Sequence, residues 1–206
     1  MIHFANSLLF IACFGSLAWG LKSFSERMPQ KEAGFTPISV AGALFMSLHG
    51  ICLFFFPAAD GIRELAGLFL YAGALSLFWW SARISRRQPL ELAYSEEEPD
   101  YLVIGGPYQY IRHPYYSSQV LVWLAGVFAS GHLMLLTTTG IMLLLYMREA
   151  GAEENRFERS GMREVFLRYK ARSGKFIPRP NVLKTLLSGK SIISQSDTGG
   201  PDKLAA

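Results

Sequence analysis

Three long runs without a charged residue constrain this chain more than any other feature. They extend over Phe4–Leu21, Ile38–Phe56 and Leu65–Ala82. A helix needs about 20 mostly apolar residues to cross the roughly 30 Å hydrocarbon layer of a bilayer. Half of the 206 residues are apolar and only 17% are charged, unlike a soluble domain of this length. We therefore predict an all-α, polytopic membrane protein, in which the first run is a retained span.

A fourth apolar region, Tyr115 to Met147, contains 33 residues, too many for one span. Ser130-Gly131-His132 divides it, because glycine and small polar residues interrupt apolar helices. We predict a helical hairpin of two short spans here, with a re-entrant hairpin as the alternative. Together with the three longer runs, this gives a bundle of about five transmembrane helices.

The distribution of basic residues predicts the orientation of the bundle. The segments Lys22–Pro37 and Arg83–His113 and the tail from Arg148 hold 19 of the 20 Lys and Arg residues, leaving only Arg63 for the other face. The positive-inside rule then puts the N-terminus outside and the C-terminus in the cytoplasm. The net charge of +4 follows from this topology, so we expect no nucleic-acid partner.

The cysteines and histidines argue against a disulfide framework and a metal site. Cys13 and Cys52 both lie in apolar runs, where a lone thiol behaves as a small hydrophobic side chain. The four histidines lack the spacing of metal ligands. His49 lies inside an apolar run, and we expect it to make a hydrogen bond to another helix.

The polar, aromatic segment Gly105–Tyr116 is the expected active site. Its glycines and Pro107 predict a turn, and Pro114 disfavours helix at His113. We expect an ordered, non-helical segment that precedes a helix restarting near Val120. Anchoring at the membrane interface is the alternative, since Tyr and Arg favour the headgroup level.

After Met147 the composition changes abruptly to charged residues, which predicts a helix leaving the membrane and carrying Glu153-Glu154. The acidic run Glu96–Asp100 is expected to be a solvated loop. We divide the chain into a three-span membrane scaffold (1–82), a catalytic part (83–180) and a disordered tail (181–206).

Several short motifs in this chain resemble integral-membrane methyltransferases, above all the isoprenylcysteine carboxyl methyltransferases, with the phospholipid N-methyltransferases as cousins. The resemblance covers residues 100 to 180, about two fifths of the chain. The motifs that carry it are Gly106-Pro107-Tyr108, Arg112-His113-Pro114-x-Tyr116, Glu153-Glu154, Phe166-x-x-Tyr169 and Ile177-Pro178.

The resemblance implies a cytoplasmic pocket for S-adenosylmethionine, formed by the 83–114 loop and a C-terminal helix. His113 and Glu154 become the catalytic candidates, and Arg112 and Arg148 the substrate-binding candidates. Counting back from Tyr169 favours Glu154 as the cofactor's glutamate, and Glu153 is the alternative by a shift of one residue. The implied cofactor-binding residues are Tyr108, His113, Pro114, Tyr115, Tyr116, Glu153 and Glu154.

Two positions depart from the family pattern. The family's Arg four residues before the glutamate pair, which serves a substrate carboxylate, is replaced by Ala150 or Glu149, with Arg148 nearby. This change weakens the case for a carboxylate acceptor. Ser118 replaces a glycine, which is a mild change.

The residue chemistry agrees with a methyltransferase. The sulfonium and ammonium groups of the cofactor favour carboxylates and aromatic faces, and a cation–π contact contributes about 0.5–2 kcal/mol. The acceptor is expected to be a lipophilic small molecule or lipid that arrives from the membrane: an isoprenylcysteine, a phospholipid amine, a thiol or an isoprenoid-like metabolite. A non-catalytic accessory membrane protein and an NADPH-dependent membrane reductase are the competing hypotheses.

Overall fold

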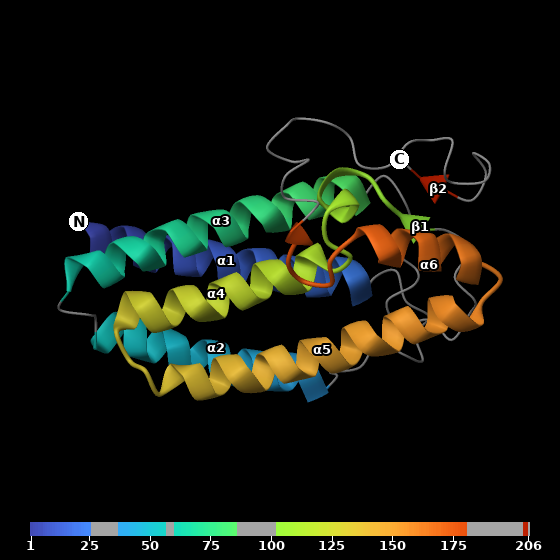
Figure 1. Ribbon diagram of the computed structural model, residues 1–206. Helices are drawn as coiled ribbons and strands as arrows, with labels where there is room; N and C mark the ends of the chain where they lie inside the picture. Colours follow the sequence, from blue (N-terminus) through green and yellow to red (C-terminus); the bar gives the residue numbers. More distant parts are fainter. Residues whose placement is uncertain (26–36, 57–59, 86–101, 181–203, 206) are drawn as a thin grey trace. The chain divides into compact units, whose positions relative to one another are not determined.

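The computed structural model describes residues 1–25, 37–56, 60–85, 102–180 and 204–205, and these are mostly helical (Figure 1). Residues 86–101 and 181–203, which include the acidic run and most of the predicted disordered tail, lie outside the described residues. The elements in chain order are α1 (Ile2–Ser25), α2 (Pro37–Phe55), α3 (Gly61–Ser85), β1 (Leu102–Val103), the 3-10 helix η1 (Gly106–Gln109), α4 (Pro114–Ser130), α5 (Leu135–Arg159), α6 (Arg163–Arg172) and β2 (Leu204–Ala205).

The chain forms two compact units by packing, whereas the predicted division into scaffold, catalytic part and tail is one of function and stays a prediction. The first unit comprises Met1–Phe78 and Ser118–Arg148, and the second comprises Trp79–Ser117 and Glu149–Ala206. The prediction assigned the 115–147 hairpin to the catalytic part. In the structure most of the hairpin belongs with the first three helices, because its apolar side chains pack against theirs.

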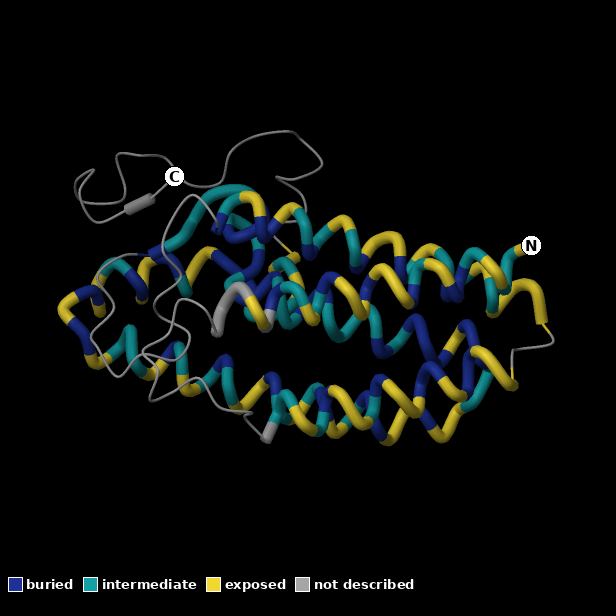
Figure 2. The backbone as a smooth tube through the Cα atoms, turned by 180° about the vertical axis from the view of Figure 1, so that it is seen from behind, coloured by how far each residue is buried: buried dark blue, intermediate teal, exposed yellow. Residues whose placement is uncertain are grey.

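The first unit is a bundle of helices that lie side by side (Figure 1). Three of the described helices are long and apolar enough to cross a membrane, at Ile2–Gly20, Ile38–Phe55 and Gly61–Ser85. Each helix has buried and exposed positions that alternate around its axis (Figure 2). Many exposed positions carry large apolar side chains, such as Phe4 and Phe69. Such an outer surface is stable in lipid and is unusual in water.

The predicted break in the fourth apolar region is confirmed. Helix α4 ends at Ser130 and α5 begins at Leu135, with Gly131 between them at a φ of 72°. Glycine adopts this left-handed conformation without strain, which is why it commonly terminates helices. The two helices then pack against each other, and the Trp123 indole donates a hydrogen bond to the Tyr146 hydroxyl over 3.1 Å.

His49 makes the predicted bond to another helix. Its Nε2 lies 2.8 Å from the hydroxyl oxygen of Thr138 on α5, and this hydroxyl donates to the Leu135 carbonyl over 2.8 Å. The His49 ring also packs edge-on against Trp123 of α4. Gly126 makes room for it, because a Cβ there would overlap the imidazole. A buried polar group is thus satisfied inside an apolar bundle, as its cost of desolvation requires.

Helices α3 and α4 approach each other closely at Gly67, which gives a test of the bundle. A Cβ on Gly67 would lie 2.7 Å from the Ala129 Cβ and 2.9 Å from its backbone nitrogen. We expect Gly67→Ala to destabilise the first unit by about 1–3 kcal/mol, since the backbone must shift. Thermal unfolding in detergent checks this, with a thiol-reactive dye reporting exposure of the buried Cys13 and Cys52.

Gly73, on the same helix, is the matched control for this substitution. A Cβ there meets nothing within 4 Å, so Gly73→Ala should leave the unfolding temperature unchanged or raise it. Equal unfolding temperatures for the two variants would contradict the close approach at Gly67.

The second unit contains the end of α3, the segment from β1 to the start of α4, the charged end of α5, and α6. Helix α5 runs without interruption from Leu135 to Arg159, so its charged end continues the apolar helix. The small core of the second unit consists of Leu102, Met162, Phe166 and Tyr169. Strand β1 pairs in parallel with β2, Leu102 opposite Leu204 and Val103 opposite Ala205.

Candidate functional site

The segment Gly105–Tyr116 is ordered, and it is more helical than predicted. Gly106 begins the short helix η1 at a φ of 56°, and a Cβ there would lie 2.6 Å from the Ile84 side chain. Helix α4 begins at Pro114, six residues before the predicted restart at Val120. Proline suits the first position of a helix because its fixed φ is helical and its missing N–H needs no partner there. Tyr115 and Tyr116 are therefore in the first turn of α4.

The residues that follow α6 hold this segment in place through the backbone. The Arg112 N–H donates to the Gly174 carbonyl over 2.8 Å, and the His113 N–H donates to the Lys175 carbonyl over 3.1 Å. The Gly174 N–H returns a bond of 2.9 Å to the Tyr110 carbonyl. These bonds fix the positions from which the Arg112 and His113 side chains extend.

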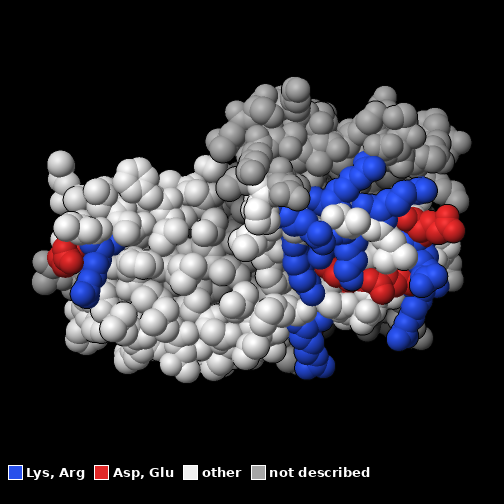
Figure 3. Space-filling model, in the orientation of Figure 1, with Lys and Arg blue, Asp and Glu red and all other residues white. Residues whose placement is uncertain are grey.

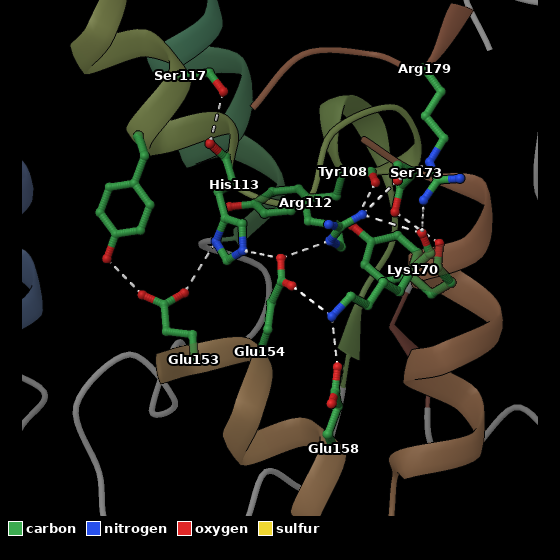
Figure 4. A network of polar contacts seen from close by, with 12 residues as sticks. Tyr108, Arg112, His113, Ser117, Glu153, Glu154, Glu158, Lys170, Ser173 and Arg179 are labelled. Atoms are coloured by element: carbon green, nitrogen blue, oxygen red, sulfur yellow. Dashed lines mark hydrogen bonds and ion pairs between the residues drawn. The ribbon is translucent and has the colours of Figure 1, made fainter. Parts of the chain in front are cut away.

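Glu154, on α5, is the centre of a buried ionic network (Figure 4). Its Oε1 accepts a hydrogen bond of 2.9 Å from Arg112 Nε and lies 3.1 Å from His113 Nε2, and its Oε2 lies 3.1 Å from Lys170 Nζ. The Glu154 side chain is only 7% exposed. Burial raises the pKa of this carboxyl, but the bonds from His113, Arg112 and Lys170 outweigh it, so the pKa lies well below its ordinary value.

His113 lies between two carboxylates. Its Nε2 faces Glu154, and its Nδ1 lies 3.3 Å from Glu153 Oε2. Burial lowers the pKa of His113, but hydrogen bonds and charges from Glu153 and Glu154 raise it above the ordinary value overall. Because both ring nitrogens face acceptors, the doubly protonated imidazolium is favoured. In this state His113 has no lone pair with which to accept a proton.

Glu153 keeps more of its surface accessible than Glu154. Its Oε1 accepts a hydrogen bond of 2.6 Å from the Tyr116 hydroxyl, and its side chain is 23% exposed. A carboxylate offers about four acceptor positions, and the contacts with Tyr116 and His113 leave some of them for a ligand. Glu153 is therefore the carboxylate of the pair better able to meet a bound cation.

Three aromatic rings lie together beside Glu153. The rings of His113 and Tyr116 stack with centroids 5.8 Å apart, and Phe176 packs edge-on against both, at 6.0 and 6.3 Å. The Ser117 hydroxyl fixes this arrangement by donating to the Phe176 carbonyl over 2.6 Å. Lys175 Nζ lies 6.0 Å from the centre of the Phe176 ring, so a cation already occupies one aromatic face.

Tyr108 is buried in the same unit. Its carbonyl accepts a hydrogen bond of 2.7 Å from the Tyr169 hydroxyl. Within the described part of the chain, its own hydroxyl makes no hydrogen bond of good geometry. Burial raises the pKa of the Tyr108 hydroxyl well above its ordinary value, with smaller contributions from Tyr115 and Tyr169. This hydroxyl is therefore a neutral polar group that a ligand atom could satisfy.

The remaining predicted residues have other environments. Pro114 is fully buried, and the Tyr115 hydroxyl lies 2.8 Å from the Ser85 hydroxyl. Arg112 was predicted to bind substrate, but it is engaged internally: besides Glu154 it donates to the carbonyls of Lys170 (3.3 Å) and Ser173 (2.6 Å). Arg148 is an exposed residue of α5 that belongs to the first unit.

Two residues of the site were missed by the sequence analysis. Lys170 bridges Glu154 and Glu158, with 2.7 Å between its Nζ and Glu158 Oε1. Phe176 completes the aromatic cluster. Both are next to motif residues, Lys170 after Tyr169 and Phe176 before Ile177. Their adjacency to the motifs was the one signal available, and it does not indicate which way a side chain points.

No protein-family model, no curated protein and no solved structure matches this chain. Its chemistry is therefore inferred from its own residues and from the motif resemblance. Among the predicted residues, the second unit brings together Arg112, His113, Tyr116, Glu153 and Glu154.

Proposed function

We propose that this chain is an S-adenosylmethionine-dependent methyltransferase acting at the cytoplasmic membrane face on a lipophilic acceptor. The observation that carries the proposal is the convergence of two motifs far apart in the sequence. His113 lies 41 residues before Glu154, and its ring is between Glu153 and Glu154. These are residues that the motif resemblance assigns to the cofactor.

The chemistry of the site residues fits this cofactor. Glu153 supplies a partly accessible carboxylate for a cationic group, and the rings of Tyr116 and Phe176 supply aromatic faces. The buried Tyr108 hydroxyl, which makes no hydrogen bond of good geometry among the described residues, supplies a neutral hydrogen-bonding group. When bound, S-adenosylmethionine supplies an electrophilic methyl group on a sulfonium.

The adjacent glutamates have different roles in this proposal. Glu154 holds Arg112, His113 and Lys170 in position, and so preorganises the site. Glu153 meets the cofactor's cation and, for an acceptor that must lose a proton, is the better general base. His113, as an imidazolium, holds both carboxylates and is not the base.

The contacts of the site argue against a carboxylate as the methyl acceptor, and so against carboxyl O-methylation. Arg112 is buried and donates to Glu154 and two carbonyls, and Ala150 is buried where the resemblance would put a carboxylate-binding Arg. An amine acceptor, methylated on nitrogen, needs no such cation and benefits from Glu153. These contacts therefore favour a phospholipid amine over an isoprenylcysteine as the acceptor.

The proposal includes a five-span topology with the N-terminus outside. Helix α4 has 17 residues, which corresponds to about 25 Å of helix. This length, and the apolar first half of α5, support two short spans beyond the three long ones. The proposed cytoplasmic segments carry 19 of the 20 Lys and Arg residues.

Isothermal titration calorimetry with S-adenosylmethionine on the detergent-purified protein tests the proposal. We expect saturable binding by the wild type and its loss in His113→Ala, because that change leaves Glu153 and Glu154 facing each other without the cation between them. Glu158→Gln, which alters only the outer ion pair with Lys170, is the control and should bind as the wild type does. Folded wild type that binds no S-adenosylmethionine would overturn the proposal, and binding of NADPH would favour a reductase.

A further inference from the structure

Helix α6 has an outward face that the proposed chemistry does not use. Its opposite side is buried through Phe166 and Tyr169. We call the exposed side the α6 outer face; it consists of Arg163, Glu164, Leu167, Arg168, Ala171 and Arg172.

The part of the chain that carries this face has more basic than acidic side chains. The stretch 149–180 contains eight Lys and Arg residues and five Glu residues. Three of the five, Glu153, Glu154 and Glu158, are already engaged within the ionic network of the site. Within the described residues, neither Arg163 nor Arg168 forms an ion pair. Basic side chains accordingly gather over α6 and the end of α5 (Figure 3).

Apolar side chains are exposed in the same unit. Leu167, in the middle of the α6 outer face, is 39% exposed, and Ile177 is 77% exposed. Ile177 belongs to a segment anchored by backbone bonds at Gly174 and Lys175, so its exposure is not that of a free chain end. Basic side chains next to exposed aliphatic ones can bind an anionic lipid surface, through electrostatic attraction and the burial of apolar area.

We propose that the α6 outer face, together with Ile177, binds the headgroups of anionic phospholipids. The Arg163 and Arg168 guanidinium groups would pair with lipid phosphates, for which their planar donor geometry is suited. Leu167 and Ile177 would enter the boundary between headgroups and acyl chains. A lipid surface is favoured over an acidic protein because the same chain has three helices able to cross a membrane, and a chain anchored in this way is always next to a bilayer. The surface would hold the second unit where a lipophilic acceptor arrives.

The test uses the full chain in nanodiscs of phosphatidylcholine alone or with increasing phosphatidylglycerol. Hydrogen–deuterium exchange of peptides covering 163–180 is the readout. We expect exchange to slow as phosphatidylglycerol is added. In the double variant Arg163→Gln/Arg168→Gln, the phosphatidylglycerol fraction needed for half-maximal protection should rise, by about fivefold for each arginine removed. Leu167→Asn should weaken this protection, while added salt should reduce the protection by the same factor as in the wild type.

Arg63→Gln is the matched control. It removes the same charge from an exposed arginine of the first unit, one that lies 3.5 Å from Asp60. This variant should behave as the wild type does. Protection independent of phosphatidylglycerol, or an equal effect of Arg63→Gln, would overturn the proposal. If replacing Glu96–Glu98 with Gln abolished the slowing of exchange, the proposal would also be overturned, because this chain's own acidic run would then be what covers the α6 outer face. S-adenosylmethionine binding should be unchanged in all these variants, which separates this surface from the proposed activity.

Discussion

Replacing Glu154 with Gln is expected to loosen the second unit by about 3–5 kcal/mol, the usual cost of leaving buried charges without a partner. The change keeps the volume of the side chain but removes its charge. Arg112 and His113 then keep positive charges in a buried site, and each loses its ionic partner on Glu154. The backbone bonds from Arg112 and His113 to Gly174 and Lys175 should open as a result.

Hydrogen–deuterium exchange of peptides covering 107–117 and 173–176 measures this loosening directly. A local readout is needed because a chain of two units does not have to unfold in one step. Glu158→Gln is the control: the Glu158 side chain is 32% exposed and, among the described residues, forms an ion pair only with Lys170, so the change should cost no more than about 1 kcal/mol. Similar exchange in the two variants would show that Glu154 is not the centre of the network.

Replacing Glu153 with Gln is expected to weaken S-adenosylmethionine binding about 10- to 100-fold and to leave the fold intact. A hydrogen bond to a charged group contributes about 1.5–3 kcal/mol, which corresponds to that change in affinity. Glu153 is partly exposed, and Gln keeps an oxygen that accepts from the Tyr116 hydroxyl. Little structural cost is therefore expected.

Calorimetry and exchange on the same Glu153→Gln preparation separate the two effects. Weak binding with wild-type exchange at 107–117 would support Glu153 as the residue that meets the cofactor. Wild-type affinity in this variant, with binding lost in a folded Glu154 variant, would return that role to Glu154, which the motif register favours. Tyr116→Phe removes only the hydroxyl that bonds Glu153 and should give an intermediate loss.

The division between the two glutamates follows from helix geometry. Consecutive residues on an α-helix point about 100° apart, so adjacent side chains meet largely different neighbours. Glu154 points toward Arg112 and Lys170 (Figure 4). Glu153 accepts its hydrogen bond from Tyr116. His113 contacts both, because its two ring nitrogens point in different directions. The sequence identified the pair but not which member faces inward.

Some features of the fold were predictable because their causes are local. The three long helices follow from uninterrupted apolar runs, and the break after Ser130 follows from Gly131. The hydrogen bond of His49 was predictable in kind, since a buried polar group needs a partner. Its partner Thr138, 89 residues away, was not, because no local rule connects the two positions.

Which segments are apolar helices, where they break, and which polar residues gather in short motifs could all be read from the amino-acid order alone. Those properties depend on composition and spacing over a few turns of chain. Three features emerged only from the folded chain: Arg112 is engaged internally, Lys170 and Phe176 belong to the site, and the 118–148 hairpin packs with the first three helices. These outcomes depend on several elements packing at once, and the direction of each side chain is set by neighbours distant in the sequence.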